Sequence, residues 1–115
     1  MQDIRKTGSN ARLSQVAVHN GTVYLSGQTS QITGGVQEQA ADIFSKIDRL
    51  LSDAGTDRTK LLSAQIWLTD MADFNAMNQV WEQWLEGTQP PVRACLHSIL
   101  ANPAYKIEVQ VIAAS

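Results

Sequence analysis

The sequence predicts an α+β domain in which two amphipathic helices cover one face of a mainly antiparallel β-sheet. An Asn20-Gly21 pair between two β-prone runs is typical of a tight hairpin. Apolar residues then recur at steps of three and four, as in helices that bury one side, over 36–54 and again over 74–85. Three further β-prone runs complete a ββ-α-β-α-ββ order, at 60–68, 92–98 and 106–113.

Length and composition favour one cytoplasmic domain spanning residues 1–115. A chain of 115 residues can bury a core without disulfides, and its single cysteine suits a reducing compartment. The net charge of −2, with no basic stripe, argues against nucleic-acid binding. No apolar run approaches the ~20 residues of a membrane span, and residues 1–12 lack the apolar centre of a signal peptide.

The first half of the chain holds a hairpin and a helix. Strands are expected at Gln15–His19 and Thr22–Ser26, because both positions of a type I′ turn need a positive φ. After a loop over Gln28–Gly35, a helix should run from Val36 to Ala54. Gly55 can end it, since glycine adopts the left-handed conformation at little cost.

The second half alternates strand and helix. Lys60–Leu68 alternates apolar and polar residues, as a half-buried strand does. Asp70 can cap the next helix and Gly87 can end it. Pro90-Pro91 forbids helix and sets an extended entry into a strand at Val92–Ser98.

A last strand at Lys106–Ala113 leads to a sheet whose two faces differ. The residues expected under the helices are Val23, Leu25, Leu62, Ala64, Ile66, Val92, Ala94, Leu96, Ile107, Val109 and Val111. The residues expected on the other face are Tyr24, Gln65, Trp67, Arg93, Cys95, His97, Glu108 and Gln110. Because this second set is neither fully polar nor fully apolar, we expect another copy of the chain to cover it and leave room for a small ligand.

Arg93 and Glu108 are the chemical candidates on that second face. A guanidinium grips a carboxylate with two hydrogen bonds, and the carboxylate could be that of Glu108 or of a ligand. Glu108 lies among apolar residues, where desolvation would raise its pKa and let it orient or deprotonate a water. A neighbouring Arg93 would lower that pKa, and a solvent-facing charge with no chemical role is the alternative.

The other candidates have weaker support. Cys95 could be a nucleophile, although a buried free cysteine is usually an inert apolar group. His97 lies two strand residues away, roughly 6–7 Å, which is too far for direct contact with its thiol. Ser26-Gly27 ends a strand, where glycine permits close approach to a ligand or simply forms a turn. The histidines and the cysteine lack metal-ligand spacing, so no metal site is expected.

Four stretches carry a family resemblance: NGTVYLSGQ, AGTDRTKLLSAQIWLTDMADFNAMNQVWEQW, PPVRAC and KIEVQVIA. In this order, over nearly the whole chain, they resemble the RidA/YjgF family of reactive-intermediate deaminases. The resemblance implies a chorismate-mutase-like fold, assembled as a homotrimer with ligand clefts between subunits. It also implies hydrolysis of 2-imino and 2-enamino acids to 2-oxo acids and ammonia, without a metal or cofactor.

The resemblance further implies a role for particular residues. Arg93 would hold the substrate carboxylate, and Glu108 would position the attacking water. Cys95 would lie near the ligand, while Ser26 and Gly27 would line the cleft.

Asn78, on the second helix, matches a family asparagine near the cleft. Leu13 stands at or near a position where many active members carry a tyrosine, and Gln110 replaces a second acidic residue. With these departures the chain resembles a divergent subgroup of the family. They leave open a non-catalytic protein that binds a small carboxylate in the same cleft, whereas a ribonuclease or chaperone role has little support from the acidic charge balance.

Overall fold

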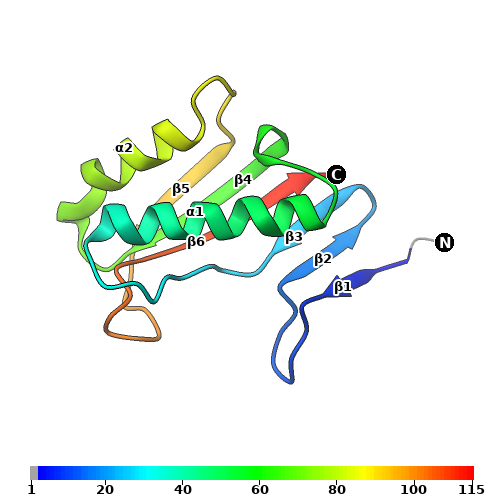
Figure 1. The fold of residues 1–115 in the computed structure, drawn as a ribbon, viewed down its shortest axis with the longest axis horizontal. Coiled ribbons are helices and arrows are strands. Elements are labelled where there is room, and N and C mark those ends of the chain that lie inside the picture. Colours follow the sequence, from blue (N-terminus) through cyan, green and yellow to red (C-terminus); the bar gives the residue numbers. More distant parts are fainter. Residues whose placement is uncertain (1–2) are drawn as a thin grey trace.

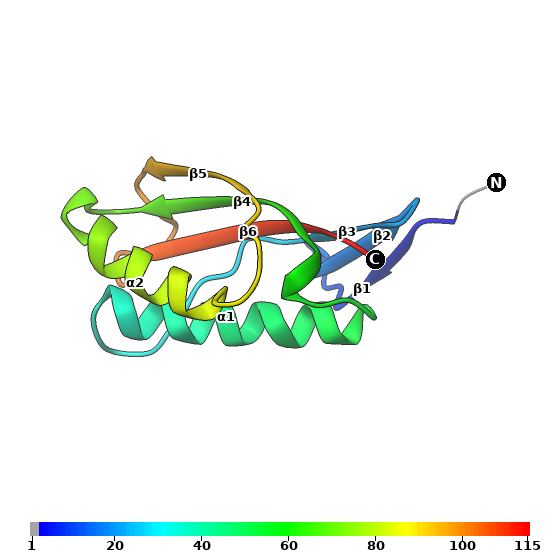
Figure 2. The same ribbon diagram turned by 90° about the horizontal axis from the view of Figure 1, so that it is seen from above.

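A six-stranded mixed sheet carries both helices on one of its faces (Figures 1 and 2). The computed structural model describes residues 3–115. The strands are β1 (Arg5–Thr7), β2 (Val16–His19), β3 (Thr22–Leu25), β4 (Leu61–Leu68), β5 (Val92–His97) and β6 (Ile107–Ala114). The helices are α1 (Val36–Asp53) and α2 (Phe74–Trp84), with 3₁₀ turns at Arg58–Lys60 and Met71–Asp73. The predicted α+β class and order of elements are confirmed, apart from β1.

The strands lie in the order β1-β2-β3-β6-β4-β5. Strands β4 and β5, joined through α2, are the one parallel pair in the described part of the chain. The β2–β3 hairpin turns at Asn20 (φ 53°) and Gly21 (φ 75°), as the sequence predicts. Strand β1, which was not predicted, consists of three exposed residues that add an edge to β2.

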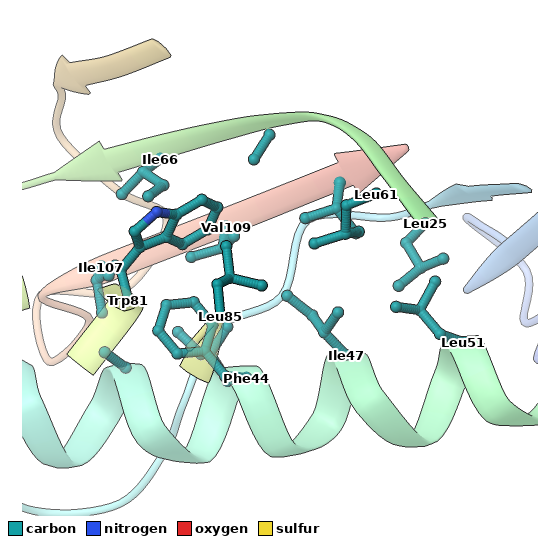
Figure 3. Packing of buried hydrophobic residues seen from close by; sticks show 14 of the residues in the cluster. Leu25, Phe44, Ile47, Leu51, Leu61, Ile66, Trp81, Leu85, Ile107 and Val109 are labelled. Carbon is teal, nitrogen blue, oxygen red and sulfur yellow. The ribbon is translucent and has the colours of Figure 1, made fainter. Parts of the chain in front are cut away.

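Helix α1 lies along the sheet and supplies much of the core (Figure 3). Ile43, Ile47 and Leu51 are fully buried on the side that the three- and four-residue spacing predicts. Where α2 crosses α1, Phe44 stacks on Trp84 with the ring centroids 4.5 Å apart. Trp81 meets Phe44 edge-on at 5.8 Å, so this aromatic cluster fixes α2 against α1 and thereby against β5.

Strand β5 faces the opposite way from the prediction. Val92 is 72% exposed, whereas Arg93 and Cys95 are half-buried on the helix side. The register explains the difference: Arg93 lies beside Ala64 and Cys95 beside Ile66, and both of these β4 residues are buried. Neighbours in register share a face, so the phase of β5 follows from β4 and not from its own apolar residues.

A bulge causes a second correction in β4. The register shifts between Leu61 and Ser63, so that Leu61 is buried and Leu62, predicted to lie under the helices, is 49% exposed. Beyond the bulge Ala64 and Ile66 are buried as expected.

The open face of the sheet is therefore more apolar than predicted. Arg93, Cys95 and His97 do not belong to it, and side chains of the opposite phase replace them, namely Val92, Ala94 and Leu96. Its polar residues follow the prediction, because Glu108 lies beside Trp67 and Gln110 beside Gln65. No helix within residues 3–115 is long and apolar enough to cross a membrane.

Candidate functional site

Arg93 lies where edge strand β5 meets helix α2. One of its guanidinium nitrogens donates a hydrogen bond to Asn78 Oδ1 at 2.7 Å. The guanidinium carbon lies 5.3 Å from the ring centroid of Trp81 and 5.9 Å from that of Phe74. An amide acceptor and two aromatic faces therefore fix the position of the cation before any ligand arrives.

Arg93 also lines a hollow of about 360 Å³. Its lining residues are Asn78, Trp81, Glu82, Pro90, Pro91 and Arg93. Neither of the salt bridges within residues 3–115 includes Arg93. The ion pair with Glu108 considered above is thus not formed within one chain, and the guanidinium fork is available to an external carboxylate.

Glu108 lies on the open face of the sheet, half-buried and directly against Gly27. A Cβ at position 27 would collide with Glu108 Oε2 and lie 3.1 Å from its Cδ. Two backbone hydrogen bonds between Gln28 and Val109, of 2.7 and 3.0 Å, hold this end of the β3 segment on β6. A side chain at position 27 would therefore require the Glu108 carboxylate to move.

Ser26 belongs to a different environment from its neighbour Gly27. Its hydroxyl donates to Gln15 Oε1 at 2.8 Å and accepts from Gln28 Nε2 at 3.1 Å. Gln28 pairs with the core residue Val109 and is 9% exposed, which places its side chain on the helix side of the sheet. No sequence pattern marks Gln15 as functional, and the one signal for Gln28 is its place directly after Ser26-Gly27.

Arg93 and Glu108 do not converge in a single chain. Glu108 lies beside Trp67, which lies beside Leu96, three residues beyond Arg93. The spacing and rise of strands then put the two Cα atoms roughly 14 Å apart, with the side chains on opposite faces. The expectation that both share one face is therefore wrong for one chain.

The remaining predicted residues lie apart from both groups. Cys95 packs against the core beside Arg93; burial raises the pKa of its thiol, and the Arg93 charge offsets this only in part. His97 is exposed, and its Nε2 lies 3.1 Å from the carbonyl oxygen of Thr69. Leu13 is 46% exposed in the loop between β1 and β2. Within residues 3–115 no group of three or more His, Cys, Asp or Glu side chains could hold a metal ion.

Residues 4–115 match the family model described as endoribonuclease L-PSP. This chain belongs to the RidA/YjgF family. It is 38% identical over 112 residues to a RutC family protein of Haemophilus influenzae, covering 96% of this chain and 97% of that protein. A crystal structure of a YjgF family member from Neisseria meningitidis superimposes with a TM-score of 0.95 at 37% identity, covering 98% of this chain and 95% of the other.

A relative with a named activity is more distant from this RidA/YjgF chain. The 2-iminobutanoate/2-iminopropanoate deaminase of Capra hircus is 31% identical over 107 residues, covering 87% of this chain and 77% of the goat protein. Both the sequence and the fold are thus those of the family that the sequence motifs resemble.

Proposed function

We propose that the protein hydrolyses 2-imino and 2-enamino acids to 2-oxo acids and ammonia. The observation that carries this proposal is Arg93, a cation held by Asn78 and by Trp81, with donors left free in a hollow large enough for a small acid. A guanidinium in this state suits the carboxylate that every 2-imino acid carries. The similarity to a 2-iminobutanoate/2-iminopropanoate deaminase supports the same substrate class.

The proposed site lies between two copies of the chain in a homotrimer. Arg93 and Glu108 lie on opposite faces of one sheet, so a single substrate can contact both only if a neighbouring subunit supplies one of them. The open face that carries Glu108 also presents Val92, Leu96 and Trp67, which favours its burial against another subunit.

In this mechanism Arg93 fixes the substrate carboxylate and so directs C2 toward Glu108 of the adjacent subunit. Glu108 orients a water and accepts its proton as the oxygen bonds to C2 and the C=N bond becomes single. Glu108 then returns this proton to the nitrogen, which completes the carbinolamine. It next relays the hydroxyl proton to the same nitrogen, so that the C–N bond breaks, ammonia leaves and C2 becomes a carbonyl. Imines already hydrolyse in water, so positioning and one proton-shuttling residue, together worth about 10²–10⁴-fold, suffice without a metal or cofactor.

The test generates 2-iminobutanoate and 2-iminopropanoate in situ and follows oxo-acid release against the uncatalysed rate. Arg93→Ala and Glu108→Gln should each lose the acceleration. If the two residues come from different subunits, a mixed oligomer of the two inactive variants contains some complete sites and recovers about a quarter of wild-type activity with random mixing. A wild-type protein without acceleration, or an Arg93→Ala variant as active as wild type, would falsify the proposal.

A second candidate is a non-catalytic binder of small carboxylates at the same site. Gln110, which replaces a second family acid, and Leu13, which replaces a tyrosine, favour it because both remove a potential proton donor or acceptor. This candidate predicts that 2-oxobutanoate binds, that Arg93→Ala abolishes binding, and that wild type gives no rate above the uncatalysed reaction.

A further inference from the structure

A second hollow, of about 270 Å³, lies beside α1 on the helix side of the sheet. Its lining residues are Gln15, Gln28, Lys46, Arg49 and Leu50. None of them lines the Arg93 hollow, and none belongs to the open face that carries Glu108. The proposed function therefore leaves this group of polar side chains without a role.

The orientation of the two amides in this hollow follows from their partners. Gln28 Nε2 lies 3.2 Å from the backbone oxygen of Ser26 and 3.0 Å from Gln15 Oε1. Because a backbone oxygen only accepts, the nitrogen end of Gln28 must point toward it. Gln28 Oε1 then has no hydrogen-bond partner within residues 3–115, and although most of the residue is buried, this oxygen itself is accessible from outside.

The second amide presents the complementary group. Gln15 Oε1 accepts from both the Ser26 hydroxyl and Gln28 Nε2. Its Nε2 makes no hydrogen bond to any residue in 3–115, so it remains available as a donor. The hollow thus contains an unused acceptor on Gln28 and an unused donor on Gln15.

The charge at the hollow is positive. Lys46 is largely compensated, because Nζ donates to the Thr29 carbonyl oxygen at 2.8 Å and lies 3.5 Å from Asp42. Arg49 forms no salt bridge with any described residue, and no acidic side chain lines the hollow. The Arg49 charge also acts on Asp42, but a guanidinium without a salt bridge, beside a free amide donor, still favours an oxyanion.

We propose that this hollow binds a small oxyanion that carries a hydrogen-bond donor of its own. The oxyanion lies against Arg49 and Gln15 Nε2, and its donor reaches the accessible Gln28 Oε1. A 2-hydroxy acid and monohydrogen phosphate both meet this description, since each combines an oxyanion with an O–H group. Acetate has the charge without the donor at neutral pH and should bind more weakly.

The test titrates the full-length protein separately with lactate, inorganic phosphate and acetate, following the side-chain NMR signals of Gln15, Gln28 and Arg49. Lactate or phosphate should shift these signals saturably with a Kd on the order of 1 mM, as a few charge-assisted hydrogen bonds give at an open site. Arg49→Met should weaken binding at least about tenfold. The matched control Arg5→Met removes an exposed arginine from β1 and should leave the Kd unchanged.

The outcomes distinguish the parts of the proposal. Tighter binding of lactate than of phosphate identifies a carboxylate ligand, and the reverse identifies a phosphate ligand. Acetate bound as tightly as either, a Kd unaffected by Arg49→Met, or no saturable shift with lactate and phosphate overturns the proposal. Signals from Asn78 and Arg93 provide an independent check, because ligand shifts confined to them would mean that the Arg93 site alone is occupied.

Discussion

Gly27 determines where the carboxylate of Glu108 can lie. Gly27→Ala should displace that carboxylate and destabilise the protein by about 1 kcal/mol, because the new Cβ meets Glu108 Oε2. In a Glu108→Ala background the collision is absent. Gly27→Ala should then be neutral or should stabilise the protein, because alanine lowers the conformational entropy of the unfolded chain. Urea unfolding of the four proteins in this cycle measures the coupling, and equal costs in both backgrounds would show that Glu108 is not the obstacle.

Cys95 should behave as an unreactive thiol. Burial raises its pKa, and the weaker opposing effect of the Arg93 charge does not reverse the shift. Iodoacetamide should therefore alkylate Cys95 in the folded protein at pH 7 more slowly than in urea, and Arg93→Ala should slow the reaction further. Cys95→Ala should keep its activity, whereas rapid alkylation of the folded protein at neutral pH would contradict this account.

At the scale of single residues, the sequence does not predict a role that depends on which side chains lie nearby in the fold. PPVRAC identifies Arg93 as a candidate anion anchor from its chemistry alone. Gln15 and Gln28, which bond to Ser26 and to each other, could not be predicted as a pair, because the role of an amide depends on its hydrogen-bond partners in the fold. The same holds for position 27, where the space beside the backbone is occupied by Glu108, 81 positions away in the sequence.

At the scale of elements, a buried hydroxyl ties the loop before α1 to that helix. Ser30, 1% exposed, donates to Asp42 Oδ2 at 2.6 Å, and this bond, followed by the Lys46 charge, lowers the pKa of Asp42. A pKa lowered on folding stabilises the protein at neutral pH, and this contribution disappears as the pH falls through the folded value.

Ser30→Ala should therefore lower the free energy of unfolding by about 1 kcal/mol at pH 7. The difference from wild type should narrow on acidification, because a protonated Asp42 benefits less from the bond. Urea unfolding at a series of pH values measures this, with Asp42→Asn as the comparison that removes the titration. A difference that stays constant down to acid pH would rule out the Ser30–Asp42 bond as its source.

Local sequence patterns predicted most of the helices and strands. They failed where contacts with other elements determine whether a strand forms or which way its side chains face. The Asn20-Gly21 turn and the stripe of α1 depend on residues close in sequence, and both were found. Strand β1 has three exposed residues and no pattern to detect. Strand β5 alternates clearly between two sets of residues, but its pairing with β4 determines which set faces the helices. A shift of one residue in this assignment moves Arg93 to the other face.

At the scale of the whole molecule, the open sheet face should mediate self-association. The protein measures only 20 Å along its shortest axis, the thickness of one sheet and one layer of helices, so that one side of the sheet lacks a cover (Figure 2). Leu96→Asp places a charge on this face and should give folded monomers without imine hydrolysis, because burying an unpaired carboxylate between subunits is costly.

Ile32→Asp is the matched control for Leu96→Asp. Ile32 is 43% exposed, close to the 42% of Leu96, but lies in the loop before α1. Sedimentation velocity should find its mass unchanged from wild type. A Leu96→Asp protein with the wild-type mass would mean that the open face is not the contact between subunits.

The central place of β6 sets when this protein can fold during its synthesis. Residues 107–114 form a strand between β3 and β4, so the two halves of the sheet have no shared partner until these residues leave the ribosome. Until then the hairpin can form locally, but the apolar side of α1 has no complete surface to pack on. Nascent chains that stop before Ile107 should remain sensitive to protease, and full protection should begin only once residues 107–114 have left the ribosome.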